Sequence, residues 1–254
     1  GMLQMGATFK ISVNDRLPLF VSLQSPIMSD PAASVEPSRP APDETRSVVK
    51  AAGLIGVATF SSRILGFVRD MVLARLFGAT PAADAFFVAY RIPNLLRELF
   101  AEGSMSAAFI PVFTEYHTLK TKRDAWELAS ATFTTLLTIV TAVTLLGILA
   151  APGIVWLLAP GFRGSPDKLA LTTLLTQMMF PYLIFVSLAA LAMGILNSLR
   201  AFAAPAFSPV FFNIATIACM LFLSPWLPEP ILGVAVGIVV GGVAATVHGS
   251  ARLT

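Results

Sequence analysis

Four long stretches without a charged residue dominate the C-terminal half of the chain. Their bounds are Glu127 and Arg163, Lys168 and Arg200, Arg200 and Glu229, and Glu229 and Arg252. Each can hold a helix of about 20 apolar residues, the length that crosses about 30 Å of hydrocarbon. Because only helices and closed barrels satisfy the backbone in lipid, and because strict alternation is missing, we expect membrane-spanning helices.

The composition excludes most soluble proteins of this size. Of the 254 residues, 56% are hydrophobic and only 12% are charged, and the mean hydropathy is +0.79. A soluble domain carries about 25% charged residues, so too little polar surface remains for a cytosolic enzyme or a secreted domain. The net charge of +3 is modest, and we expect no nucleic acid as a partner.

Residues that usually carry chemistry are scarce. The single cysteine, Cys219, excludes a disulfide framework and a thiolate zinc cluster, and two histidines leave little for a metal site. The sequence has no G-x-x-x-x-G-K-[ST] phosphate loop, and no serine has an evident base beside it. We expect no catalytic residues, no metal and no cofactor.

The charged N-terminal half adds two spans to these four. Residues 48–116 are rich in Leu, Ile, Val, Phe and Ala, with a turn at 77–84 (FGATPAAD). The predicted fold class is an all-α, polytopic transmembrane helix bundle with six spans, near 48–77, 82–116, 125–159, 168–199, 207–225 and 231–249. Residues 1–45 are expected to be a disordered or non-native extension with the natural start at Met28, and residues 46–254 a six-helix transmembrane lobe.

The basic residues near the predicted loops set the orientation. One side of the membrane would hold Arg46, Lys50, the KTKR cluster at 120–123, Arg200 and Arg252. The other side would hold Arg163 and Lys168. Because cytoplasmic loops carry the excess of Lys and Arg, both ends of the chain are predicted to be cytoplasmic.

The first two spans carry charged residues at membrane depth. One Arg, Lys or Asp at the centre of a span costs about 2.5–3.5 kcal/mol on translocon scales. At about 100° per residue, one stripe of the second span gathers Asp84, Arg91, Glu98 and Glu102. This stripe, and Arg63 well inside the first span, predict an aqueous cavity or a substrate pathway.

The surplus of arginine favours an anionic ligand. Guanidinium binds phosphate oxygens bidentately and stays charged, so a phosphate or diphosphate headgroup is the expected ligand. Two alternatives stay open. A proton-coupled transporter could use Asp84 and Glu102 as a relay, and Arg75, Arg91 and Glu98 could be interfacial residues or structural ion-pair partners.

A series of segments points to one family. They are SRILGFVRD (62–70), FGA (77–79), DAFFVAYRIPNLLRELFAEGS (84–104), AAFIPVF (107–113), APGF (159–162), FPYLIFVSLAALAMGILNS (180–198) and FAAPAFSPVFFNI (202–214). In this order they closely resemble the MurJ/MviN lipid II flippases, a family of the multidrug/oligosaccharidyl-lipid/polysaccharide exporter superfamily. The resemblance covers about residues 48–249.

The resemblance implies a two-lobed transporter of the bacterial cytoplasmic (inner) membrane. Members of the family have fourteen helices, in two six-helix lobes plus a final pair, and this chain would supply the N-terminal lobe, with the C-terminal lobe absent. A cationic cavity between the lobes receives the diphosphate headgroup of lipid II, the undecaprenyl-linked peptidoglycan precursor, and alternating access moves it across the membrane. The implied partners are lipid II, membrane lipids and the missing lobe.

The resemblance also implies the site residues. Arg63, Arg69 and Arg97 would bind the diphosphate, Asn94 and Glu102 match polar cavity positions, and Ser62 would assist them. Asp84 would act in gating or in an ion pair, for which Arg91 is the expected partner on the same helical stripe.

Other functions remain as alternatives. One is a related polysaccharide-lipid flippase or a drug or cation antiporter of the same superfamily. An antiporter for cationic drugs should favour acidic cavity residues. Another is a membrane-embedded lipid-phosphate enzyme, which would need an acidic metal cluster or a nucleophile with its base. The last is a non-functional fragment.

Overall fold

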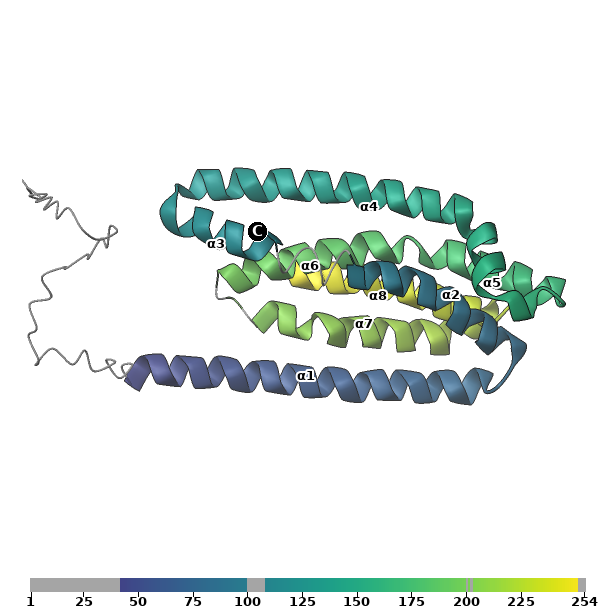
Figure 1. Ribbon diagram of the computed structural model, residues 1–254. Coiled ribbons are helices and arrows are strands. Elements are labelled where there is room, and N and C mark those ends of the chain that lie inside the picture. The colour runs from purple at the N-terminus through teal and green to yellow at the C-terminus, as the bar shows by residue number, and fades with distance from the viewer. Residues whose placement is uncertain (1–41, 100–107, 200, 202, 251–254) are drawn as a thin grey trace, which may run out of the picture. The chain divides into compact units, whose positions relative to one another are not determined.

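The computed structural model describes residues 42–99, 108–199, 201 and 203–250, and within these ranges every regular element is a helix (Figure 1). The α-helices are α1 (Pro42–Phe77), α2 (Pro81–Arg97), α3 (Ile110–Leu119), α4 (Lys122–Leu158), α5 (Pro166–Met179), α6 (Tyr182–Ser198), α7 (Ala203–Phe222) and α8 (Leu232–Ser250). Two short 3-10 helices, η2 (Pro160–Phe162) and η3 (Ser224–Trp226), lie in the connections after α4 and α7. The all-α fold class is confirmed. Of the extension predicted at 1–45, residues 1–41 lie outside the described residues, whereas residues 42–45 belong to the first turn of α1.

Five helical stretches of the described chain, not six, are long and apolar enough to cross a membrane. They are Ala52–Phe77, Lys122–Leu158, Pro166–Ser198, Ala206–Trp226 and Leu232–Ser250. The predicted spans near 48–77, 125–159, 168–199, 207–225 and 231–249 correspond to them. Within Pro166–Ser198 the helix is interrupted at Pro181, where a proline lacks the N–H that the helical ladder needs.

The sixth span, predicted at 82–116, is wrong in extent. Its described residues form the 17-residue α2 and the 10-residue α3, and residues 100–107 lie outside the described residues. The charged stripe of α2 lowers its hydropathy, and its length falls short of the roughly 20 apolar residues that a span requires. The helices α2 and α3 therefore need protein neighbours or water beside their polar faces.

The turn between α1 and α2 follows the sequence closely. Gly78 adopts φ of +53°, a left-handed conformation that glycine tolerates at the end of a helix. Thr80 caps α2, because its hydroxyl oxygen accepts a hydrogen bond from the Ala83 N–H at 3.3 Å, and Pro81 occupies the first helical position. The cap fixes Asp84 in the first turn of α2.

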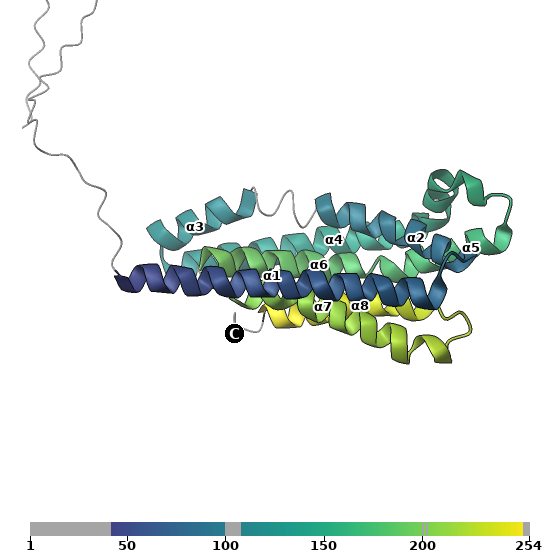
Figure 2. The ribbon, with the colours of Figure 1, turned by 90° about the horizontal axis from the view of Figure 1, so that it is seen from below.

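The centre of the bundle is formed by α6 and α8, with α1 and α4 on opposite sides (Figures 1 and 2). The helices α7 and α8 approach closely, because a Cβ atom at Gly237 would lie 3.1 Å from the Thr216 carbonyl oxygen, and one at Gly241 would lie 2.9 Å from the Phe212 oxygen. In a membrane such small residues let two backbones pack tightly. One buried cluster joins α1, α2, α5, α6, α7 and α8, and another joins α3, α4 and α6.

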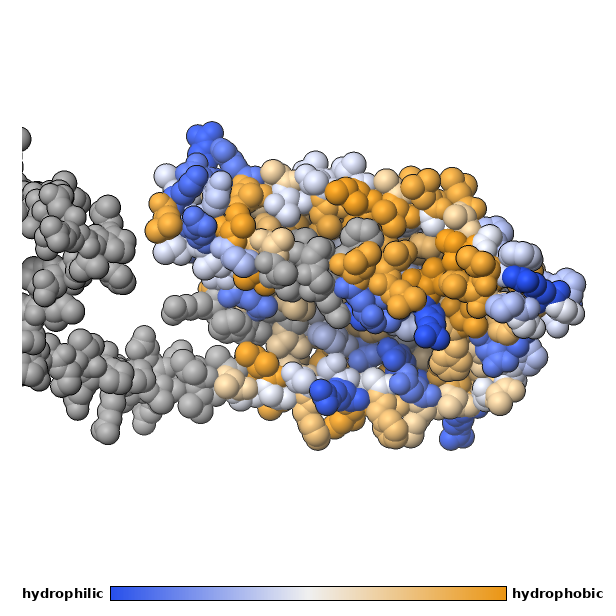
Figure 3. Space-filling view, viewed as in Figure 1, coloured by the Kyte–Doolittle hydropathy of each residue, from blue (hydrophilic) through white to orange (hydrophobic). Residues whose placement is uncertain are grey.

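Helix α1 packs mainly against α7 and keeps most of its length exposed. In the space-filling view, hydrophilic residues gather between α2 and α1, with apolar surface on either side (Figure 3). Within the described chain, the site residues predicted from the sequence belong to these two helices.

Candidate functional site

A cavity of about 460 Å³ lies between α1, α2, α6, α7 and α8, with the start of α3 at its edge. Its size falls within the range of about 300–1,000 Å³ that is usual for ligand pockets. The polar part of its lining consists of Arg69, Tyr90, Asn94, Arg97, Tyr182, Asn197, Ser208 and Asn213. The remainder is apolar and includes Phe109, Ile110 and Phe212.

Arg69, on α1, is held from two sides. Its Nε and Nη2 donate to the Asp70 Oδ1 at 3.0 and 2.9 Å, and its Nη1 donates to the Asn213 Oδ1 at 3.2 Å. The side chain of Asp70 is 62% exposed, whereas that of Arg69 is only 24% exposed. The guanidinium is thus fixed on the cavity wall, while the Asp70 carboxylate stays largely exposed.

Arg97 comes from the last turn of α2 and is oriented by a residue of its own helix. Its Nε donates to the Asn94 Oδ1 at 3.0 Å, and the Asn94 Nδ2 in turn donates to the Glu98 Oε1 at 3.3 Å. Spacings of three and four residues place these side chains on neighbouring turns of one helical face. Asn94 therefore supports Arg97 as well as lining the cavity.

The charge of the cavity wall is positive. Its described lining contains two arginines and no carboxylate. Guanidinium groups donate in a planar fork that matches phosphate and diphosphate oxygens. The neighbouring amides and tyrosine hydroxyls add neutral hydrogen-bonding groups, so the cavity has the chemistry to hold an anionic headgroup with polar substituents.

The other predicted binding residues do not line this cavity. Arg63 is exposed on α1, and Ser62 takes part through its backbone carbonyl, which accepts a hydrogen bond from the Asn213 Nδ2 at 3.2 Å. Glu102 lies outside the described residues. The roles predicted for these three residues stay predictions.

The ion pair of Asp84 differs from the one expected. Its carboxylate pairs with Lys168, at the start of α5, with 2.7 Å between Nζ and Oδ2. The predicted partner Arg91 is exposed and forms no ion pair with any residue that the structure describes. The stripe on α2 could indicate only partners within the same helix. The packing of α2 against α5 brings Lys168 to Asp84 instead.

Sequence reasoning missed Asn213, as it missed the other uncharged polar lining residues Tyr90, Tyr182, Asn197 and Ser208. Asn213 lies in the middle of the charge-free stretch 201–228, for which the sequence predicts a membrane span near 207–225 and no site residue. A buried amide within an apolar span is costly unless it is hydrogen-bonded. The presence of an asparagine in this stretch was therefore the available signal. For metal binding, no group of three His, Cys, Asp or Glu residues comes together within the described part of the chain.

The comparisons with known proteins agree on one family. The family model of the lipid II flippase MurJ matches residues 73–249. A probable lipid II flippase MurJ of Vibrio cholerae serotype O1 is 42% identical over 205 residues, covering 78% of this chain and 39% of that protein. The lipid II flippase MurJ of Burkholderia cenocepacia is 40% identical over 185 residues, covering 73% of this chain and 36% of that protein.

The fold agrees with the sequence match. A solved structure of the lipid II flippase MurJ in an inward closed conformation aligns with a TM-score of 0.59 and 30% identity, over 74% of this chain and 40% of that one. The chain thus spans about two fifths of the length of these relatives. On the sequence match and the shared fold, the chain belongs to the MurJ lipid II flippase family.

Proposed function

We propose that this chain forms the N-terminal lobe of a lipid II flippase in the bacterial inner membrane. The whole transporter moves the undecaprenyl-diphosphate-linked peptidoglycan precursor by alternating access, and the lobe works together with a C-terminal lobe. The single observation that carries the proposal is the cavity wall that presents Arg69 and Arg97 without a carboxylate among its described lining residues.

The proposed chemistry is recognition and movement, not catalysis. Arg69 and Arg97 bind the diphosphate, Asn94 orients Arg97, and the amides and tyrosines around them meet the sugar. Arg63, Ser62 and Glu102 are further contacts expected from the family resemblance. In this account Asp84 keeps α2 in place through its ion pair with Lys168.

The proposed orientation has both ends of this chain in the cytoplasm. It requires α2 and α3 together to bring the chain back across the membrane, and α3 lies at the end of the bundle where α1 begins (Figure 1). This orientation is supported by the location of the basic residues, because the turn between α3 and α4, with its cluster at 120–123, and the C-terminal end of α8 lie at one end of the bundle (Figure 1). Arg163 and Lys168 follow the other end of α4. An excess of Lys and Arg marks cytoplasmic loops.

A drug or cation antiporter of the same superfamily is a weaker candidate. Its cationic substrates need a carboxylate in the cavity, since an arginine would repel them. The described lining residues offer the opposite charge.

Rescue of cells depleted of their own lipid II flippase tests the proposal. The full-length product of the gene that encodes this sequence should restore growth, and so should Arg75→Gln, which changes an exposed arginine near the end of α1. Arg69→Gln and Arg97→Gln should lose rescue at equal expression, because each removes a diphosphate contact. Arg63→Gln should also lose it. Full rescue by Arg69→Gln and Arg97→Gln would overturn the binding site.

A further inference from the structure

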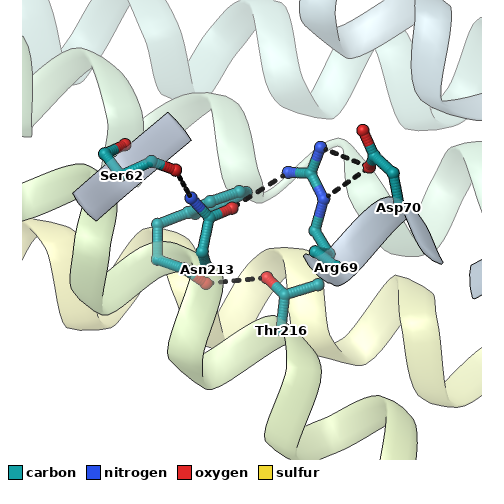
Figure 4. A network of polar contacts seen from close by, with 6 residues as sticks. Ser62, Arg69, Asp70, Asn213 and Thr216 are labelled. Atoms are coloured by element: carbon teal, nitrogen blue, oxygen red, sulfur yellow. Dashed lines mark hydrogen bonds and ion pairs between the residues drawn. The ribbon is translucent and has the colours of Figure 1, made fainter. Parts of the chain in front are cut away.

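Asn213 links α7 to two separate points on α1 (Figure 4). Its side chain is buried, with only 5% of the residue exposed. The Nδ2 donates to the Ser62 carbonyl oxygen at 3.2 Å, and the Oδ1 accepts from the Arg69 Nη1 at 3.2 Å. The Asn213 amide thus donates to the backbone of α1 and accepts from the Arg69 guanidinium.

The chemistry of the two partners fixes the orientation of this amide. An arginine only donates and a backbone carbonyl only accepts, so an inverted amide would make neither bond. Aspartate could accept from Arg69 but would turn an anionic oxygen towards the Ser62 carbonyl. Alanine or leucine would leave both partners without this contact, so an asparagine is the residue type that serves both.

The geometry of α1 brings its two partners to one place. Ser62, Gly66 and Arg69 are spaced by four and three residues and therefore share a face. Carbonyls point towards the C-terminus of a helix, whereas side chains lean towards its N-terminus, so the Ser62 oxygen and the Arg69 side chain converge. A Cβ atom at Gly66 would lie 3.7 Å from the Asn213 Nδ2, which places the amide directly over this glycine.

Asn213 and Asp70 together leave part of the guanidinium for a ligand. Their hydrogen bonds engage Nε, Nη1 and Nη2 of Arg69 once each, and a guanidinium has five N–H groups. Asp70 is largely exposed, while Asn213 is buried between helices. Asn213, the buried partner, therefore makes the orientation of the Arg69 side chain depend on the packing of α1 against α7.

We propose that Asn213 is a positioning residue for anion binding, which holds the Arg69 guanidinium on the cavity wall in the orientation that meets a diphosphate. The inference rests on the proposed function, since it assigns a role within the same site. Asn213 acts through Arg69, and its amide makes this effect depend on the contact between α7 and α1.

Binding of inorganic pyrophosphate to the purified full-length protein in lipid nanodiscs tests the inference. Asn213→Ala should weaken binding about tenfold, since a hydrogen bond to a charged group is lost. Asn213→Asp should also weaken it, because its carboxylate neutralises the guanidinium. The matched control is Thr216→Val, at a buried residue one turn along α7. Its hydroxyl donates to the Phe212 and Gly237 carbonyls and forms no hydrogen bond with Arg69. This variant should bind like the unaltered protein.

A double-mutant cycle separates positioning from a general effect on folding. In an Arg69→Gln background, Asn213→Ala should cause no further loss of binding. Equal losses in both backgrounds would show that Asn213 acts on the fold alone and would overturn the inference. Unfolding temperatures are measured for every variant. If Asn213→Ala does not fold, the size-matched Asn213→Asp is used in its place. An unchanged affinity of Asn213→Asp for pyrophosphate would then overturn the inference.

The results also distinguish the inference from the proposed function. If the unaltered protein does not bind pyrophosphate, or if Arg69→Gln binds equally well, the proposed function fails and the inference fails with it. If Arg69→Gln weakens binding while Asn213→Ala binds normally, only the inference fails.

Discussion

Lys168 at the start of α5 reaches across to Asp84 at the start of α2, with 2.7 Å between the Lys168 Nζ and the Asp84 Oδ2. The same ammonium lies 4.1 Å from the centroid of the Phe162 ring. The side chain of Lys168 is 18% exposed and that of Asp84 is 59% exposed. The pair anchors the first turn of α2, whose last turn carries Arg97.

Breaking this ion pair should destabilise the protein modestly. Asp84→Asn and Lys168→Met should each lower the free energy of unfolding by about 0.5–1 kcal/mol, since the pair is partly solvated. Thermal unfolding of the purified protein measures the loss. The charge swap Asp84→Lys with Lys168→Asp should recover part of it. If the swapped protein loses more free energy of unfolding than the two single variants lose in sum, the two side chains do not form a direct pair.

The contact between η3 and the start of α8 should not tolerate added atoms. A Cβ atom at Gly233 would lie 2.8 Å from the Ser224 Cα and N, which are backbone atoms and cannot rotate away. Gly233→Ala should therefore lower stability by about 1–3 kcal/mol, the usual cost of overpacking. Gly153→Ala in α4 is the control, because nothing lies within 4 Å of its Cβ position. Equal melting temperatures for both variants would contradict the close packing.

Filling the cavity should block its ligand without removing a charge. Ala190, on α6, lines the cavity, and a tryptophan there would take up much of the 460 Å³. Ala190→Trp should abolish rescue of flippase-depleted cells while its expression stays normal. Ala150→Trp, on an exposed part of α4, should still rescue. Normal growth with Ala190→Trp would mean that the cavity is not on the transport route.

Larger side chains at Gly66 should disturb the Asn213 amide, and through it Arg69, more than smaller ones do. Gly66→Ala should leave rescue unchanged, since its Cβ would make ordinary contact with the Asn213 amide at 3.7 Å. Gly66→Leu should displace that amide and lower rescue, and Asn213→Ala should lower rescue for the same reason. If Gly66→Leu grows as well as Gly66→Ala, the position of the Asn213 amide has no bearing on function.

The spans were predictable because their signal is local. A charge-free stretch such as 128–162 has one stable form in lipid, a helix, and α4 covers nearly all of it. The stretch 82–116 was harder to predict. Of its described charged residues, Arg97 lines the cavity and Asp84 pairs with Lys168 on α5. Both positions depend on packing between helices, which the apolar content of the stretch does not reveal.

The site was predictable only in part, because it depends on pairing between distant helices. Arg63 and Arg69 differ by six residues, which places them about 120° apart on α1. Arg69 faces α7 and the cavity, whereas Arg63 is exposed. Sequence alone could not tell which of the two arginines faces α7. Nor could it supply Lys168 as the partner of Asp84, or Asn213 as the partner of Arg69.

The affinity of the purified full-length protein for lipid II tests the central claim most directly. Native mass spectrometry in lipid nanodiscs would compare the unaltered protein, Arg69→Gln, Arg97→Gln and the exposed control Arg75→Gln. We predict that Arg69→Gln and Arg97→Gln each weaken binding about tenfold or more, while Arg75→Gln binds normally and inorganic pyrophosphate competes. Unchanged lipid II affinity in both cavity variants would contradict the account.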